Sequence, residues 1–273
     1  MTTVTRLVPY LVALAMLWTS PLQAAEPEEG SQTAQEFARE ILFDMANFMA
    51  GLERFGVTVR GGFDAVQDDG RKIEFLERQQ VTISRPNLLR VDQTHEDGRK
   101  NLVLFDGSDI TVWDDAAQVY AQAPQPGSID DAFVYFTRDL QMKLPLGSLL
   151  LQQLPEELES RLISVEYVEY ALAPLFPVDA QHITLRTPVA EVQLWIADDL
   201  ERPWPLRLVL TYPDQPGAPQ YWAEFSDWTE RPQINRSTFE FKPPADAEQI
   251  VFSVQVFPMP GAAARVEPTE EQP

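Results

Sequence analysis

The residues that could support catalysis are few in this chain. It has two histidines, His95 in a polar turn and His182 at the start of a predicted strand, and it has no cysteine. Neither histidine belongs to an H-x-x-x-H or H-E-x-x-H pattern, in which one helix face presents two zinc ligands. Without thiolates, a zinc site would need an unusual set of carboxylates. We therefore expect no metal and no cofactor, and we expect His182 to be a half-buried strand residue.

Nucleophile and acid–base patterns are also incomplete. Gly107-Ser108 and Gly147-Ser148 lack the second glycine and the strand-to-helix context of a G-x-S-x-G nucleophile elbow. Acidic pairs could in principle divide the roles of acid and base. Each pair falls in a predicted turn, where a solvated loop is expected: Asp68-Asp69, Asp114-Asp115 and Asp198-Asp199. The sequence thus favours a protein that is not an enzyme.

The first 24 residues have the pattern of a secretory signal peptide. Arg6 precedes an apolar run over residues 7–18, and small and polar residues follow as far as Ala24. The run is shorter than the ~20 residues that a membrane span requires. We expect cleavage after Ala24 or Ala25 and a soluble periplasmic protein without a transmembrane anchor. The alternative, an uncleaved signal anchor, has no second hydrophobic stretch or basic flank to support it.

The charge balance excludes one class of partner. The chain has 42 acidic and 21 basic side chains, which gives a formal net charge of −21. Such a field repels phosphate backbones and anionic membrane surfaces. We therefore expect no nucleic-acid partner.

Periodicity predicts one helix followed by a meander of strands. Thr33 and Glu36 form a capping box ahead of apolar residues at helical spacing, with Gly51 or Gly56 as the stop. The helix should pack on a core, since its polar face is not basic. From residue 57, short strands alternate with turns, and Asp-Gly pairs supply the positive φ of tight hairpins: Asp69-Gly70, Asp97-Gly98 and Asp106-Gly107. No D-x-D-x-D-G run suggests calcium.

A helical segment interrupts the meander before strands resume. Ser128 is a predicted N-cap, and two or three short helices should lie within residues 128–159. In the later strands, Leu206, Leu208 and Leu210 should face one side of the sheet. We expect an α+β fold: one open, strongly curved antiparallel sheet, or half-barrel, with helices on its concave face. The predicted divisions are a signal peptide (1–24), a spacer (25–31), one domain (32–257) and a disordered tail (258–273).

Several longer strings resemble a known family. They are VTISRPNLLRVD, LVLFDGSDITVWDDAAQVYAQAP, LPLGSLLL, QLWIADDLERPWPLRLVLTY and PQYWAEFSDW. They are similar to an uncharacterised family of predicted periplasmic proteins, which resembles the LolA and LolB lipoprotein-carrier superfamily and its RseB-like sensors. The resemblance covers roughly residues 35–257 and implies a half-closed barrel whose interior suits acyl chains or apolar protein surface. The matching positions are Arg85, Pro86, Arg90, Asp106, Gly107, Trp195, Pro205 and Trp228.

Two features depart from that resemblance. The chain lacks the lipobox cysteine of the LolB type, so membrane anchoring is not implied. A gating arginine of the LolA type cannot be assigned, because Arg85 and Arg90 are both candidates and either could simply pair with a carboxylate.

The resemblance and the aromatic strands together suggest a binding function. The leading hypothesis is a lipid or acyl chain, free or on an acylated protein, held in the half-barrel cavity of a possible carrier. The competing hypothesis is an envelope-protein interaction or sensing module that uses the curved sheet as a docking platform. Periodicity alone does not separate a lined cavity from a packed core. The candidate ligand-binding residues are Phe75, Ile83, Phe105, Trp113, Tyr120, Leu149, Trp195 and Phe225.

Overall fold

The computed structural model describes residues 29–139, 146–235 and 237–251. The predicted signal peptide and the predicted disordered tail lie outside these residues. Over the described part of the chain, no helix combines the length and the apolar character needed to cross a membrane.

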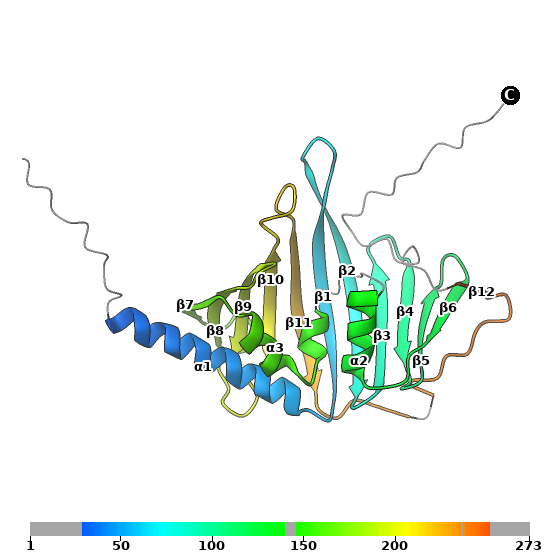
Figure 1. Ribbon diagram of the computed structural model, residues 1–273, viewed down its shortest axis with the longest axis horizontal. Helices are drawn as coiled ribbons and strands as arrows, with labels where there is room; N and C mark the ends of the chain where they lie inside the picture. The colour runs from blue at the N-terminus through cyan, green and yellow to red at the C-terminus, as the bar shows by residue number, and fades with distance from the viewer. Residues whose placement is uncertain (1–28, 140–145, 236, 252–273) are drawn as a thin grey trace, which may run out of the picture.

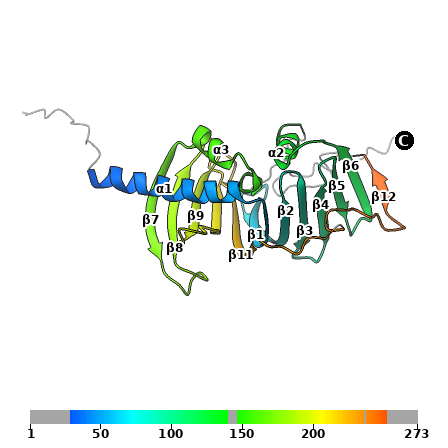
Figure 2. The ribbon, with the colours of Figure 1, turned by 90° about the horizontal axis from the view of Figure 1, so that it is seen from below.

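A single open sheet of 12 strands organises the molecule, in the order β12-β6-β5-β4-β3-β2-β1-β11-β10-β9-β8-β7. Figure 1 shows the strands side by side, and Figure 2 shows the sheet as an arc with the helices on one side of it. The first strands are β1 (Arg54–Val66), β2 (Lys72–Ser84), β3 (Leu88–His95), β4 (Lys100–Phe105), β5 (Asp109–Asp114) and β6 (Val119–Pro124). The later strands are β7 (Ser164–Ala171), β8 (Ala180–Arg186), β9 (Glu191–Ala197), β10 (Pro205–Thr211), β11 (Gln220–Thr229) and β12 (Glu248–Ile250).

The expected fold class, an open curved α+β sheet, is confirmed. One strand pair differs from the expectation, because β12 pairs with β6 in parallel and makes the sheet mixed. The predicted Asp-Gly turns also occur, since Gly70, Gly98 and Gly107 have φ of 83°, 86° and 88°. A side chain at these angles would clash with the backbone, which is why glycine follows each aspartate.

The helices lie against one face of the sheet. They are α1 (Glu29–Gly51), α2 (Ile129–Val134), the π-helical turn η1 (Tyr135–Asp139), the 3-10 turn η2 (Gly147–Leu150) and α3 (Leu154–Arg161). The long helix starts before the predicted Thr33 cap but ends at Gly51 as predicted. The Ser128 cap is confirmed, since its Oγ accepts a hydrogen bond from the Asp131 amide at 3.1 Å.

The main core lies between these helices and the sheet, on what we call the inner face. Ala38, Leu42, Met45 and Met49 form the buried stripe of α1, at the spacing of one helix face. Strand residues such as Ile110 and Val112 belong to the same core cluster and are fully buried. Each leucine, isoleucine, valine or methionine buried in this way contributes about 1.5–3 kcal/mol relative to exposure.

The opposite, outer face is covered over one part of the sheet. After β11 the chain runs beneath β1–β5, on the side away from the helices, to reach β12 (Figure 2). Arg90 Nη1 donates a hydrogen bond to the Thr238 carbonyl at 3.1 Å. The Phe241 ring lies 6.0 Å from that of Trp113 and 5.2 Å from that of Tyr120. Residues 237–250, the return segment, thus form a second layer here.

A row of charged and aromatic side chains crosses the outer face of β8–β11 and β1. His182 stacks on Trp195 at 4.0 Å, and the Arg207 guanidinium lies 5.6 Å from the Trp195 ring. Glu224 then pairs with Arg207 at 2.5 Å and with Arg60 at 3.4 Å. The Arg60 and Glu224 side chains are 62% and 43% exposed, so this part of the outer face reaches solvent.

Candidate functional site: a groove at the end of the sheet

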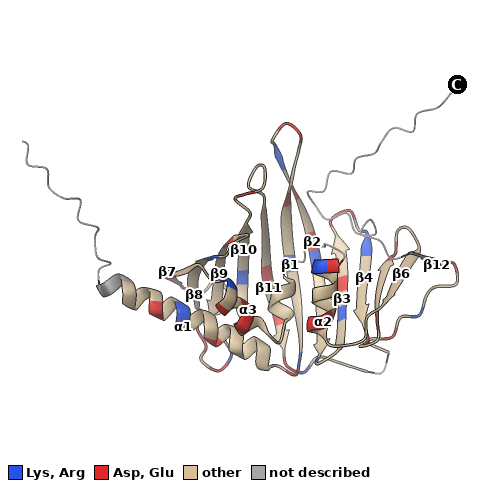
Figure 3. Cartoon of the chain, in the orientation of Figure 1, with Lys and Arg blue, Asp and Glu red and all other residues tan. Residues whose placement is uncertain are grey.

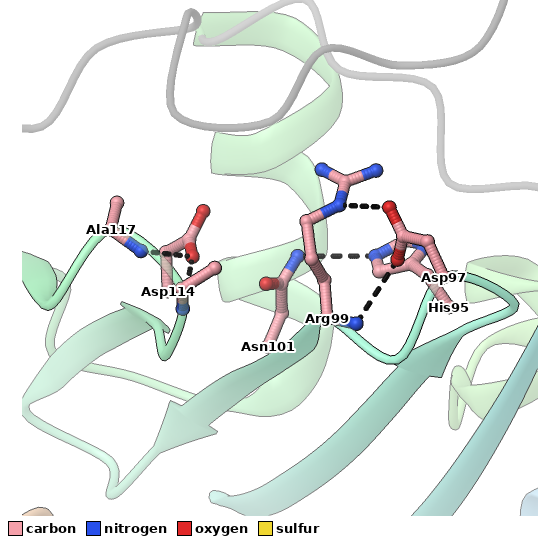
Figure 4. Close-up of polar contacts among 7 residues, drawn as sticks. His95, Asp97, Arg99, Asn101, Asp114 and Ala117 are labelled. Atoms are coloured by element: carbon pink, nitrogen blue, oxygen red, sulfur yellow. Dashed lines mark hydrogen bonds and ion pairs between the residues drawn. The ribbon is translucent and has the colours of Figure 1, made fainter.

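The candidate catalytic residues around His95 and Asp114 lie in turns, as Figure 4 shows. Asp97 accepts hydrogen bonds from the backbone amide and the Nε of Arg99, at 3.0 and 2.6 Å. The backbone hydrogen bond in particular holds the pKa of Asp97 below its ordinary value. Asp114 accepts two backbone amides, at 2.9 and 3.0 Å, and His95 Nε2 lies 3.3 Å from Asn101 Nδ2. These contacts shape the ends of the hairpins.

His182 is on β8 as predicted, but it is more deeply buried than half. Its exposed fraction is 7%, and within the described residues neither ring nitrogen has a hydrogen-bond partner. Burial lowers the pKa of the imidazole, although Glu169 opposes this shift in part. The stacked Trp195 ring covers it, which the strand pattern alone did not reveal. Among the described residues, no three histidine or carboxylate side chains come together as metal ligands would.

The eight residues expected to line a ligand cavity do not share one surface. Four belong to the inner face or pack against its core, namely Ile83, Phe105, Phe225 and Leu149. Phe75 stacks on Phe63 at 5.7 Å on the β1–β2 hairpin and is 39% exposed. The remaining three, Trp113, Tyr120 and Trp195, follow or precede inward-facing residues and therefore project from the outer face.

The two candidate arginines differ in role. Arg90 forms a bidentate pair with Asp92, with both N–O distances at 2.6 Å. Arg85 instead donates to two backbone carbonyls, those of Leu52 at 3.2 Å and Leu150 at 2.9 Å. It therefore ties the end of α1 and the end of η2 to the strand before it. Burial lowers the Arg85 pKa, and the Asp130 charge opposes that shift.

An opening with apolar walls lies where β9 and β11 end and β10 begins. We call it the end groove; its volume is about 670 Å3. It is lined by Pro177, Val178, Ala197, Asp198, Asp199, Leu200, Glu201, Arg202, Trp204, Leu206, Phe225, Ser226, Asp227 and Trp228. Three separate segments supply these residues, and of the eight predicted site residues only Phe225 is among them.

An aromatic stack forms the deep wall of the end groove. Trp204 and Trp228 are parallel at 4.6 Å and 15°, and Phe48 of α1 meets Trp204 edge-on at 4.6 Å. Trp228 Nε1 donates to the Pro205 carbonyl at 2.9 Å, so its polar atom is satisfied. The pairing of β1 and β11 shifts at Ser226–Thr229, and Asp227 has φ 56°. This bulge lets Phe225 and Trp228, three residues apart, pack on each other at 5.8 Å.

A related irregularity shapes the opposite wall. The register of β9 and β10 shifts between Pro205 and Arg207. As a result Leu206 packs with Ala197 in a second cluster, while Leu208 and Leu210 stay in the main core. The expectation that the three leucines face one side is therefore wrong for Leu206.

The rim of the end groove combines exposed leucine with fixed carboxylates. Leu200 is 99% exposed, and Leu175 and Val178 of the β7–β8 loop are 84% and 47% exposed. Asp198 accepts hydrogen bonds from Tyr170 Oη at 2.6 Å and from Gln181 Nε2 at 2.9 Å. The first of these raises the pKa of Tyr170 to about 12. The loops are thus held in place while their apolar side chains face water.

The family model described as Predicted periplasmic protein (DUF2092) matches residues 38–253. The chain belongs to this family. The localisation of the protein is accordingly periplasmic, as its sequence predicted. A comparison with curated proteins found no match.

This member of the family of predicted periplasmic proteins is also similar to several solved structures. An uncharacterised conserved protein from Thermus thermophilus is 14% identical, with 79% of this chain and 99% of that chain covered and a TM-score of 0.45. A LolA superfamily protein from Nitrosomonas europaea is 14% identical, with 75% and 97% covered and a TM-score of 0.37. The MucA/MucB complex from Pseudomonas aeruginosa gives 12% identity, 78% and 63% covered, and a TM-score of 0.41.

Proposed function

We propose that this periplasmic protein is not an enzyme and that it binds an apolar group of its ligand, an acyl chain or an apolar side chain, in the end groove. The observation that carries the proposal is the preformed Trp204–Trp228 wall beside a leucine, Leu200, that is 99% exposed. Exposed apolar surface gathered around a concave site is typical of a binding surface. No bond is made or broken in such a role, which suits a carrier or a docking module.

The energetics of such binding are sufficient without chemistry. Removing apolar surface from water contributes about 25 cal/mol per Å2, so a few hundred Å2 of contact is worth several kcal/mol before the costs of ordering. The aromatic wall needs little rearrangement, because Phe48 and the Pro205 carbonyl already hold both indoles. A preformed wall reduces the entropy lost on binding.

The space between sheet and helices offers less room for a ligand. Ile83, Phe105 and Ile110, all on the inner face, are each 0% exposed because the protein's own helices cover that face. A lipid at that position would have to displace these helices. The proposal therefore places the ligand at the end groove and not beneath α2.

A neutral fluorescent probe, N-phenyl-1-naphthylamine, tests the site directly. Titrated into the full chain, it should gain fluorescence on binding, and Leu200→Ser should weaken its affinity about fivefold. The matched control is Val189→Ser, since Val189 is also an exposed loop residue, at 63%, but lies outside the groove lining. Equal affinities for the two variants, or no binding by the unmodified chain, would overturn the proposal. Circular dichroism of both variants shows that each is folded.

A further inference from the structure

Carboxylates dominate the polar part of the end groove. Its lining contains four of them, from Asp198, Asp199, Glu201 and Asp227, and a single guanidinium, from Arg202. Figure 3 shows that acidic residues also occur on loops at both ends of the sheet and on α3. The groove therefore has an acidic rim around an apolar wall, and the whole chain adds to this field with its net charge of −21.

These four carboxylates are not equally available to a ligand. Asp198 accepts hydrogen bonds from Tyr170 and Gln181, and Asp199 accepts the amides of Glu201 and Arg202, at 2.9 and 3.0 Å. Within the described residues, by contrast, the Glu201 carboxylate has no hydrogen-bond or ion-pair partner, and the contact of Asp227 is with the neighbouring Ser226 hydroxyl. Glu201 and Asp227 thus remain free to meet a positive charge.

We infer that the occupant of the end groove is a segment of a partner protein in which an apolar anchor lies next to lysine or arginine. The inference rests on the proposed function, because it needs the apolar wall to be a binding site. A basic neighbour would meet Glu201 and Asp227 while the anchor meets Trp204 and Trp228. Opposite charges at a partly exposed rim strengthen binding about threefold each at low salt, and less at high salt.

Charge also argues against an anionic lipid as the occupant. A phosphate or fatty-acid head group would approach four carboxylates and one arginine. Like charges on the head group and on the rim oppose binding and slow the encounter. The extent of the apolar rim points to a larger partner, since exposed apolar side chains on two separate loops, Val178 on the β7–β8 loop and Leu200 on the β9–β10 loop, belong to it.

Two labelled peptides with the same apolar core test the inference by fluorescence anisotropy on the full chain. One is fluorescein-GKKLWLKKG-amide and the other is fluorescein-GEELWLEEG-amide. The basic peptide should bind at least tenfold more tightly, and its affinity should fall as salt rises from about 50 to 500 mM. Binding of the acidic peptide, or of phosphatidylglycerol vesicles, as tightly as the basic peptide would overturn the inference.

The charge variants separate this inference from the proposed function. Glu201→Gln with Asp227→Asn should weaken binding of the basic peptide about tenfold, which is more than it weakens binding of the neutral N-phenyl-1-naphthylamine. The control pair is Asp115→Asn with Glu166→Gln, two exposed acids outside the groove lining, and it should change neither affinity. If the neutral probe binds at the groove but the basic peptide does not, the partner inference fails and the proposed function stands. If neither binds, the proposed function fails.

Discussion

Two parts of the sheet bury their apolar residues in different ways. In the covered half, β2–β6 with β12, the helices pack on the inner face and the return segment 237–250 packs on the outer face. In the open half, β7–β11, α1 and α3 cover the inner face, but the outer face carries the row of side chains from His182 to Glu224. The end groove lies in the open half.

The two halves differ in what surrounds a tryptophan side chain on the outer face. Trp113 in the covered half is 8% exposed and has a phenyl ring, that of Phe241, 6.0 Å away. Trp195 in the open half lies under the guanidinium of Arg207, 5.6 Å from its ring. A phenyl ring excludes water from its neighbour, whereas a guanidinium presents a polar surface to it. The open half thus carries charged side chains on its outer face, and its exposed leucines lie at its end.

A substitution in the return segment should cause the largest loss of stability among these predictions. Phe239 of the return segment is 7% exposed, so Phe239→Ala should lower the free energy of unfolding by about 3 kcal/mol. Val178→Ala at the groove rim, where the side chain is 47% exposed, should cost less than about 1 kcal/mol. Urea denaturation of both variants measures the contrast. Equal losses would mean that the return segment is not an integral layer.

The second-largest loss of stability should come from Arg85, which links the helices to the sheet. Arg85→Met removes charged hydrogen bonds to the Leu52 and Leu150 carbonyls, and we expect a loss of about 2 kcal/mol. Arg60→Met on the outer face is the matched control, because its ion pair is 3.4 Å long and largely solvated. It should cost about 0.5 kcal/mol or less. If Arg60→Met lowers the free energy of unfolding as much as Arg85→Met in the same urea titration, Arg85 does not link the helices to the sheet.

The difference between the covered and the open half could not be predicted from the sequence, for a physical reason. Alternation identified the strands, the Asp-Gly turns and the helical interruption at Ser128, because each depends on neighbours in the chain. It did not say which face of β5 or β9 meets the helices, since both faces carry apolar residues, as Ile110 and Trp113 show. Only the path of the return segment, distant in sequence, makes the outer side of β5 a second buried surface.

Acidification should lower the stability of the protein through His182, which lies in the open half. Burial lowers its folded-state pKa below the unfolded value of 6.5, so the unfolded chain binds more protons in the window just below 6.5. Stability should therefore fall as pH drops through that window, and level off below the folded pKa. His182→Phe keeps the stacking on Trp195 but removes the titration, so its stability should fall less on acidification.

Thermal unfolding between about pH 7.5 and 5 measures this effect, which we expect to be smaller than that of Arg85→Met. The groups facing His182 are Glu169 at 4.0 Å and Gln193, which partly offset the lowering of its pKa, and Trp195 with Arg207 beyond it. Val189→Ser, which changes no titratable group, serves as the control and should keep the wild-type loss on acidification. An identical pH dependence for His182→Phe and the unmodified chain would contradict the prediction.

The site shows a second limit of sequence reasoning. Trp228 and Pro205 were recognised as matching positions, yet nothing local predicts that residues 177–178, 197–206 and 225–228 meet. Two register shifts, one beside Pro205 and one at Ser226–Thr229, turn these side chains toward a common space. Bulges break the period of two that pattern analysis relies on, so the residues that line the groove were the hardest to predict.

The smallest expected effect on stability belongs to Leu200→Ser. Leu200 is 99% exposed, so the folded protein gains nothing from its side chain, and the change should stay within about 0.5 kcal/mol. The same variant should bind the apolar probe about fivefold more weakly, which assigns this leucine to binding and not to folding. Urea denaturation and probe titration on one preparation test both statements. A stability loss approaching that of Phe239→Ala would show that Leu200 packs in solution, and the contrast between a covered and an open half would then fail at its most exposed residue.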